Sequence, residues 1–163
     1  MFRGFRRERR RENGTGMTTK RSVDEPWKTP DEYGRSLPNF TVNLMVRDVA
    51  RTIHFYTRVL EARVDYQDVD FAALLLGSLQ FMIHADHTYD RHPWFPRLQK
   101  ESARGLGAEL RLFNIDPDRL EGRARDFGAT ILQPAQEKPH GWRDGIVADP
   151  DGYAWAVARP GKT

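Results

Sequence analysis

Glu109 and Arg111 stand two positions apart in the apolar run AELRLF. Side chains at this spacing share one face of a strand and are close enough to interact. Inside a cavity, where a charge must be paired, they would form a candidate ligand site in which Arg111 reaches an anionic or carbonyl group. At a sheet edge they would pair only with each other or with water, and this alternative stays open.

The segment HADHTYDRH is a second candidate site, because it concentrates side chains that bind divalent metal ions. These potential ligands are His84, Asp86, His87, Asp90 and His92. Of these, His84 continues the alternation of the preceding strand-like residues and could reach the rim of a cavity. A metal site would therefore combine His84 with Glu109. The alternative is a polar, solvated connector that binds no ion.

The composition restricts the fold and the chemistry. One domain is expected for 163 residues, and without cysteine there is no disulfide, thiol nucleophile or thiolate metal site. No apolar run approaches the roughly 18 residues that a membrane span requires. The lack of cysteine is compatible with a reducing cytoplasm, where we expect the protein to be.

The net charge of +3 comes from the beginning of the chain. Residues 1–37 hold 10 Lys and Arg against 6 Asp and Glu, which gives +4, whereas residues 38–163 hold 16 against 17, which gives −1. We predict a disordered basic tail and an extended lead-in over residues 1–37, with Trp27 and Tyr33 attaching the lead-in to the domain. A nucleic-acid-binding domain would carry a basic face, so that function rests on the Arg-rich residues 1–16 alone and is disfavoured.

The segment from Asn39 to Ala62 predicts a strand that leads directly into a helix. Its apolar residues first alternate and then recur at helical spacing, which is typical of a strand over residues 42–46 followed by an amphipathic helix. Asp48 stands at the N-cap position of that helix. The apolar side of the strand would pack on the helix, and its other side, with Thr41, Asn43 and Met45, would face a cavity.

The second half of the chain repeats this plan, with a strand at residues 108–113 and a helix between Asp116 and Gly128. After each helix we expect three further strands, at residues 62–66, 71–76 and 79–84 in the first half and 130–133, 145–148 and 153–158 in the second. Residues 85–105 would connect the halves. The predicted fold is an α+β domain of two β-α-β-β-β modules over residues 38–160.

Three segments resemble the vicinal oxygen chelate superfamily: LMVRDVARTIHFYTRVLEA, GAELRLFNIDPDRLEGRARDFGATI and DGIVADPDGYAWAV. The superfamily includes glyoxalase I, extradiol dioxygenases and the fosfomycin- and bleomycin-resistance proteins, and the run KPHGWRDGIVADPDGY is most similar to the bleomycin-resistance branch. The resemblance implies two βαβββ modules whose eight strands curl around a central cavity, and it implies that dimers are common. Glu61 stands where the family usually has Gly, which implies slight strain at the helix end.

The resemblance also implies where a metal ion would bind. In the metalloenzymes of the superfamily, four strand positions supply His, Gln or Glu ligands, and these correspond to Thr41, Met82, Glu109 and Ala156. Thr is a poor ligand for a divalent ion, Met suits soft metals and Ala has no donor, so only Glu109 fits. We therefore expect no cofactor. The alternative is one divalent metal ion held by Glu109 and His84.

These observations predict a small-molecule-binding protein that is not a catalyst, with an aromatic or amphipathic ligand in its cavity. The predicted ligand contacts are Thr41, Asn43, Met82, His84, Glu109, Arg111, Phe113, Trp142 and Ala156. His140 and Arg143 are expected near the mouth. The expected partners are the ligand and a second copy of the chain in a homodimer. The alternative is a metal-dependent lyase, isomerase or dioxygenase of the same superfamily.

Overall fold

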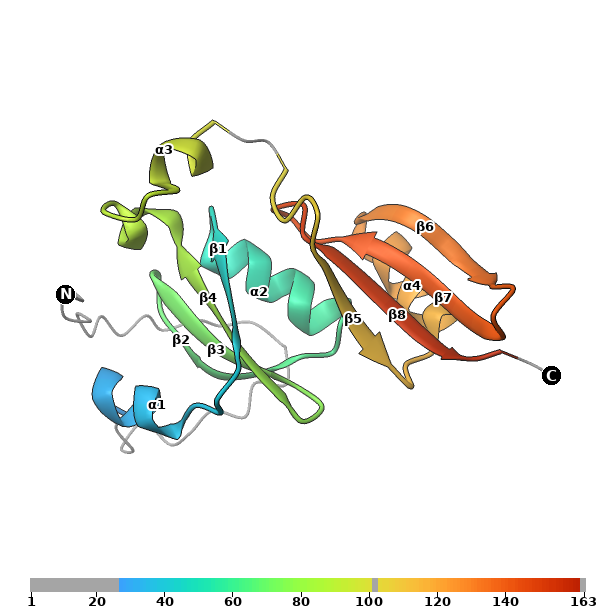
Figure 1. The fold of residues 1–163 in the computed structure, drawn as a ribbon, viewed down its shortest axis with the longest axis horizontal. Coiled ribbons are helices and arrows are strands. Elements are labelled where there is room, and N and C mark those ends of the chain that lie inside the picture. Colours follow the sequence, from blue (N-terminus) through green and yellow to red (C-terminus); the bar gives the residue numbers. More distant parts are fainter. Residues whose placement is uncertain (1–26, 101–102, 162–163) are drawn as a thin grey trace.

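The computed structural model describes residues 27–100 and 103–161. It contains two modules of the same plan, each made of a strand, a helix and three further strands (Figure 1). Module 1 comprises β1 (Val42–Val46), α2 (Val49–Arg58), β2 (Arg63–Gln67), β3 (Phe71–Leu76) and β4 (Leu79–Ala85). Module 2 comprises β5 (Glu109–Phe113), α4 (Pro117–Phe127), β6 (Thr130–Glu137), β7 (Trp142–Ala148) and β8 (Ala154–Pro160).

In the described ranges, three short helices lie outside the modules. Helix α1 (Pro30–Ser36) precedes β1, and η1 (Asp86–Tyr89) and α3 (Phe95–Leu98) lie in the connector. Residues 30–36 were expected to be extended, but they are helical because Thr29 and Glu32 form a capping box at the start of α1. The predicted basic tail lies outside the described residues.

Each module forms its own four-stranded sheet, in the order β1-β4-β3-β2 for sheet 1 and β5-β8-β7-β6 for sheet 2. In both sheets the first strand of the module pairs in parallel with the last, and the other neighbours are antiparallel. The predicted α+β class and the two βαβββ modules are confirmed. The eight strands lie in two sheets, and the described part of the chain closes no barrel.

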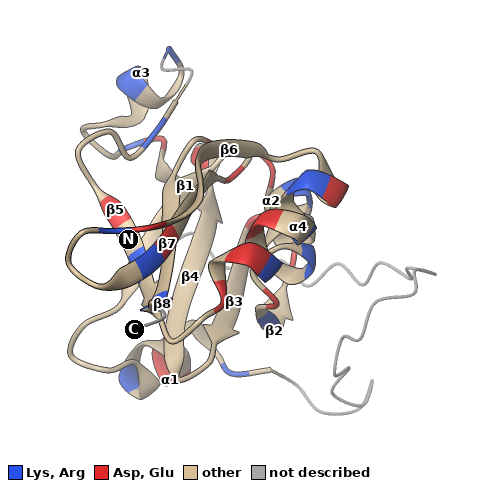
Figure 2. Ribbon diagram, turned by 90° about the vertical axis from the view of Figure 1, so that its right-hand side faces the viewer, with Lys and Arg blue, Asp and Glu red and all other residues tan. Residues whose placement is uncertain are grey.

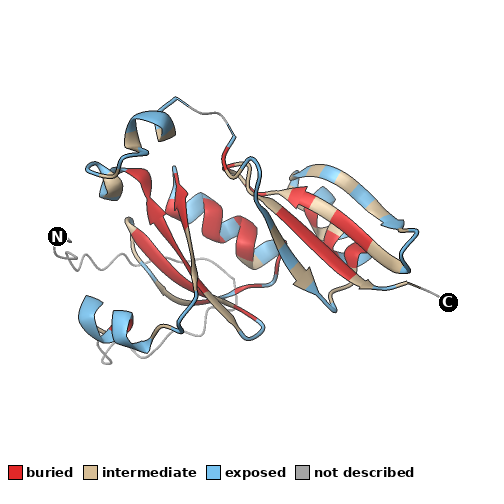
Figure 3. Ribbon diagram, in the orientation of Figure 1, coloured by how far each residue is buried: buried red, intermediate tan, exposed pale blue. Residues whose placement is uncertain are grey.

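A single hydrophobic core joins the two modules. Helices α2 and α4 each cover one face of their own sheet and also contact each other, so the core contains residues of both modules. The ring of Tyr56 on α2 lies 5.4 Å from that of Trp155 on β8 and 5.5 Å from that of Phe81 on β4. Figure 3 shows the buried residues along α2 and along the central strands of both sheets.

We call the face of each sheet that turns away from this core its outer face. The predicted alternation of β1 is correct, since Leu44 and Val46 belong to the core. On the outer face of sheet 1, Asn43 pairs in register with Met82, and on that of sheet 2, Arg111 pairs with Ala156. Because the core lies between the modules, the predicted ligand residues are divided between two separate surfaces.

Local capping signals determine where the long helices begin and end. The Asp48 side chain accepts a hydrogen bond from the backbone N–H of Arg51 at 2.9 Å, and Asp116 does the same for Asp118. Gly128 ends α4 in the left-handed conformation, with φ of 76°. Glu61, just after α2, has a φ of 59°, which is the strained position that its replacement of Gly implied.

Charges of both signs are interspersed along the elements in view in Figure 2, as the net charge of −1 for residues 38–163 predicts. None of the helices in the described ranges is both long and apolar enough to cross a membrane.

Candidate ligand-binding site

The outer face of sheet 2 holds a cavity of about 270 Å³. Its lining residues are Arg111, Phe113, His140, Trp142, Asp144 and Ala158. The rings of Phe113 and Trp142 meet edge to face, with centroids 5.5 Å apart and planes inclined at 77°. Phe113 is 54% exposed although it is a large apolar residue, so this aromatic wall is open to a ligand.

Strand β8 forms the floor of this cavity. Its outward-facing residues Ala156 and Ala158 have only methyl side chains, whereas the flanking strands carry larger ones. The register places Phe113 of β5 and Asp144 of β7 on either side of Ala158. The backbones of β5 and β7 therefore stand two strand spacings apart, or roughly 10 Å. They form a trough over β8, which the rings of Phe113 and Trp142 narrow from both sides.

One end of the trough is charged. Arg111 pairs with Glu109, and its terminal nitrogen lies 3.7 Å from Oδ2 of Asp144. The hydrogen bond to Glu109 is the main cause that raises the pKa of Arg111, so its guanidinium stays charged. The predicted contact between Glu109 and Arg111 thus exists, and it lies at the margin of the cavity.

Sequence reasoning missed the buried carboxylate of Asp144. Its residue is only 3% exposed, and its Oδ1 accepts a hydrogen bond from Nε2 of Gln133 at 2.8 Å, with Nζ of Lys138 at 3.4 Å. The alternation that places Trp142 on the outer face also places Asp144 there, two residues later. That signal was missed because β7 was predicted to begin only at Gly145.

On the outer face of sheet 1, His84, Asn43 and Tyr89 form a hydrogen-bonded chain. The amide nitrogen of Asn43 donates to the hydroxyl of Tyr89 at 2.6 Å, so its oxygen accepts from Nδ1 of His84 at 2.8 Å. Burial lowers the pKa of His84 to about 4, and the imidazole is therefore neutral at pH 7. Within the described ranges its Nε2 has no hydrogen-bond partner.

Other predicted ligand residues of sheet 1 are occupied by the chain itself. The hydroxyl of Thr41 donates to the backbone carbonyl of Gln80 at 2.9 Å. Met82 is buried in a cluster with Tyr33, Phe71 and other apolar residues. The predicted set of nine residues is thus divided into two groups. In the group on sheet 2, Arg111, Phe113 and Trp142 line the open cavity.

Residues 39–157 match the family model of the Glyoxalase/Bleomycin resistance protein/Dioxygenase superfamily. The match spans well over half of the chain. The chain belongs to this superfamily. The bleomycin-resistance branch stays a prediction, because the match does not distinguish between branches.

Two mycobacterial proteins are similar to this chain. The uncharacterized protein Mb0911c of Mycobacterium bovis is 29% identical over 129 residues, which cover 76% of this chain and 84% of the relative. The uncharacterized protein Rv0887c of Mycobacterium tuberculosis has the same identity over 129 residues, which cover 75% of that relative.

Several solved structures share the fold of this chain. A glyoxalase/bleomycin resistance protein/dioxygenase family enzyme from Burkholderia phytofirmans superposes with a TM-score of 0.62 at 19% identity, covering 74% of this chain and 96% of that one. TioX from Micromonospora sp. ML1 is 25% identical with a TM-score of 0.56, covering 76% and 98%. The fosfomycin resistance protein FosX from Listeria monocytogenes is 16% identical with a TM-score of 0.57, covering 76% and 93%.

The metal positions of the superfamily do not fit a divalent ion in this chain. Of the four corresponding residues, only Glu109 is a suitable donor, and it is hydrogen-bonded to Arg111. The alternative pair, Glu109 and His84, lies on the outer faces of different sheets. Nowhere in residues 27–100 and 103–161 do three His, Asp or Glu side chains form a group that could hold a metal ion.

The acidic and histidine side chains of the HADHTYDRH segment are used for other contacts. Asp86 is buried and accepts two hydrogen bonds of 2.6 Å from Arg104. Nε2 of His87 lies 2.7 Å from Oδ1 of Asp70 at the surface. The segment is therefore a connector with structural contacts. It differs from the solvated connector considered from the sequence, because His84 and Asp86 are buried.

Arg143 does not lie at the mouth of the cavity, where it was expected. Its side chain turns toward α4, and its Nε donates to Oδ2 of Asp118 at 2.7 Å. The reason is the alternation of β7, since Trp142 and Asp144 occupy the outer face and the residue between them must point the other way. His140, by contrast, does line the cavity.

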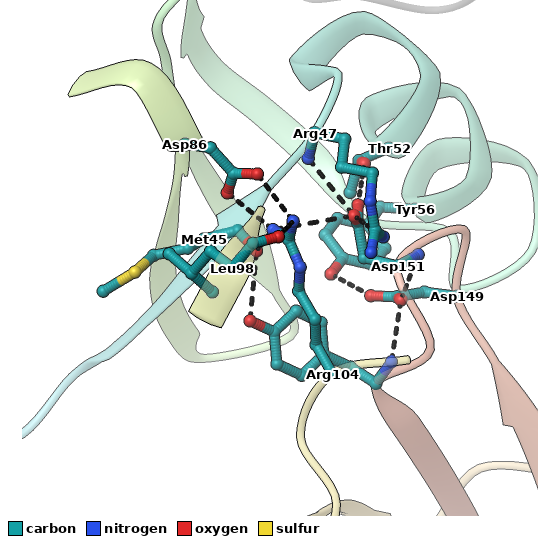
Figure 4. Close-up of polar contacts among 10 residues, drawn as sticks. Met45, Arg47, Thr52, Tyr56, Asp86, Leu98, Arg104, Asp149 and Asp151 are labelled. Carbon is teal, nitrogen blue, oxygen red and sulfur yellow. Dashed lines mark hydrogen bonds and ion pairs between the residues drawn. The ribbon is translucent and has the colours of Figure 1, made fainter. Parts of the chain in front are cut away.

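A buried polar cluster connects the two modules (Figure 4). Arg104, in the connector, binds Asp86 through both terminal nitrogens and lies 3.7 Å from Asp151 of the β7–β8 turn. In the same turn, Asp149 accepts a hydrogen bond of 2.6 Å from the hydroxyl of Tyr56 on α2. These contacts hold the second module against the first and thereby determine where the outer face of sheet 2 lies.

Proposed function

We propose that this protein binds a small molecule in the trough on the outer face of sheet 2, without a divalent ion at the positions that its superfamily uses. The observation that carries the proposal is the combination of an alanine floor, an open aromatic wall and a buried carboxylate next to an arginine. Small-molecule sites combine apolar walls with a few polar groups in this way.

The charges around the trough indicate the class of ligand. Glu109 and Asp144 are acidic, Arg111 and Lys138 are basic, and these formal charges cancel. Because these four charges already balance one another, a charged ligand would be buried without a counter-charge. The free-energy cost of desolvation is therefore lowest for a ligand that carries no net charge. We therefore propose a neutral, partly aromatic ligand, with a carbonyl that accepts from Arg111 and a donor that reaches Asp144.

We also propose that a second copy of the chain covers the trough, so that the protein is a homodimer in the cytoplasm. The trough is open on the side away from the sheet, and Phe113 and Leu132 of module 2 are 54% and 53% exposed. Apolar surface of this kind is favourably buried by association. Size-exclusion chromatography with light scattering should give the mass of two chains, and a single-chain mass at high concentration contradicts the dimer.

The binding proposal is tested with an uncharged aromatic probe, N-phenyl-1-naphthylamine, titrated by fluorescence into the wild type and two variants. Trp142→Ala removes the aromatic wall, and we expect the Kd to rise about tenfold through the lost ring contact. The matched control is Trp94→Ala, because Trp94 is 59% exposed and lies in the connector. Equal Kd values for the wild type and Trp142→Ala would exclude the trough as the site.

The metal-dependent alternative makes a different prediction. Protein purified without chelator should contain far less than one divalent ion per chain, since one suitable donor cannot hold such an ion. Elemental analysis measures this content. One ion per chain that is lost in Glu109→Ala would establish the enzyme alternative instead.

A further inference from the structure

The lead-in, residues 27–37, lies on the outer face of sheet 1. Its Trp27 indole stacks on the ring of Tyr66, with centroids 4.2 Å apart and planes inclined at 19°. It also lies 6.0 Å from the ring of Phe71. That ring in turn contacts Tyr33 at 5.6 Å and His84 at 4.7 Å, among others. An indole from the chain itself therefore occupies an aromatic slot of this sheet.

The lead-in is attached to the sheet by ring and apolar contacts. Among the described residues, its hydrogen bonds and ion pairs join residues within the lead-in, such as Lys28 to Ser36 and Arg35 to Asp31. The polar group of the lead-in that lies near the sheet is the hydroxyl of Tyr33, beside the side chain of Gln80. Burial raises the pKa of Tyr33, and the Gln80 side chain lowers it by a smaller amount. Nε1 of Trp27 is buried without a hydrogen-bond partner in the described part of the chain.

The contact between Trp27 and sheet 1 depends mainly on the stacking of aromatic rings. An aromatic stack gains its energy from area and orientation, so any planar ring of similar size can replace the indole. A ligand with a hydrogen-bond donor has a further contact available, because the neutral imidazole of His84 lies beside Phe71 and its Nε2 is unpaired. That ligand would form a hydrogen bond to His84, whereas the indole N–H of Trp27 has no such partner among the described residues.

The repeated plan of the two modules makes this slot the counterpart of the trough. The outer faces of both sheets carry aromatic residues, but the face of sheet 2 is open and that of sheet 1 is covered by the lead-in. We propose that the outer face of sheet 1 is a second binding site, for a planar aromatic molecule with a hydrogen-bond donor, and that Trp27 is its built-in, displaceable occupant.

The first test measures indole binding to the full-length protein by isothermal titration calorimetry. Trp27→Ala vacates the slot, so indole should bind with a Kd about tenfold lower than in the wild type, where it must displace Trp27. Trp27→Phe, which keeps a smaller ring in place, should give an intermediate Kd. Trp94→Ala is the matched control and should behave as the wild type. The same Kd in all four proteins overturns the proposal.

The second test asks whether a ligand releases the lead-in from the wild-type protein. Trypsin cleaves after Lys28 and Arg35, and cleavage after Arg35 requires α1 to open. With saturating indole, cleavage at these sites should accelerate about fivefold, as followed by mass spectrometry. The acceleration should persist in Trp142→Ala, which separates this site from the trough of sheet 2. Unchanged or slower cleavage means that the lead-in is a permanent part of the core and overturns the proposal.

Discussion

At the scale of single residues, the fold changes the chemistry of His84. The side chain is almost fully buried between aromatic rings, and its Nδ1 is committed to Asn43. Burial disfavours the charged imidazolium and lowers the pKa from 6.5 to about 4. In the unfolded chain the same histidine takes up a proton below pH 6.5, so proton binding favours unfolding between these two values.

This shift predicts how stability depends on pH. Neutral His84 contributes fully to stability above pH 6.5, and that contribution is lost as the pH falls toward 4, up to roughly 3 kcal/mol. His84→Gln keeps a neutral donor for Asn43 but cannot titrate, so it should lose less stability between pH 7 and pH 5. Urea unfolding at both pH values measures the difference.

The control for this prediction is His54→Gln, because His54 is exposed on α2. Its pH dependence should equal that of the wild type. If His84→Gln loses as much stability as the wild type between pH 7 and pH 5, then His84 does not carry the effect.

At the scale of elements, the chain stores strain where α2 ends. Glu61 has a φ of 59°, in the left-handed region that glycine adopts without a clash. The charge of its side chain offsets part of this strain, since Oε2 lies 3.3 Å from a guanidinium nitrogen of Arg123. The Glu61 side chain is 60% exposed, so the ion pair contributes little and the strain outweighs it.

Glu61→Gly should therefore stabilise the protein by about 0.5–1 kcal/mol, because relief of the left-handed strain exceeds the added chain entropy of glycine. The change is measured as the free energy of unfolding in urea. Glu61→Ala is the control, since it removes the ion pair and keeps the strain, and it should be neutral or slightly destabilising. A loss of stability in Glu61→Gly shows that the Arg123 contact matters more than the backbone.

At the scale of the whole molecule, the buried cluster around Arg104 determines how the two modules are placed. Its guanidinium donates to Asp86 and to the backbone carbonyl of Met45, and its own backbone N–H donates to the carbonyl of Asp151 at 2.9 Å. Arg104 is thus tied to β1, to η1 and to the β7–β8 turn. Both outer faces depend on this arrangement.

Arg104→Met should destabilise the protein by roughly 3–5 kcal/mol, because it leaves the buried carboxylate of Asp86 without its partner. Chemical denaturation measures the loss. Arg97→Met is the control, since Arg97 lies exposed on α3 and should change stability by less than about 0.5 kcal/mol. Similar stabilities of the two variants would show that the ion pair with Asp86 is not required.

Much of the fold could be predicted from the sequence, because it depends on neighbours within a few positions. Alternation predicted β1 and the outward direction of Asn43, and carboxylates predicted the helix starts at Asp48 and Asp116. The strain at Glu61 followed from one residue type at a helix end. These signals are local, so they do not require knowledge of how the modules pack.

The candidate site needed contacts between residues that are distant in the chain. Whether the sheet 1 positions were open could not be predicted, because Trp27 and Tyr33 cover that face by packing on Phe71 and Met82. The partners of Arg104 could not be predicted either, because they belong to elements that only the shared core brings together.

The sequence by itself determined the superfamily, the two modules and the face on which the residues of β1 and β5 lie, since alternation and capping depend on residues only a few positions apart. Only the tertiary structure decided that the ligand residues separate into an open trough on sheet 2 and a covered slot on sheet 1. The physical reason is that α2 and α4 bury their apolar sides against each other, which turns both outer faces away from the common core.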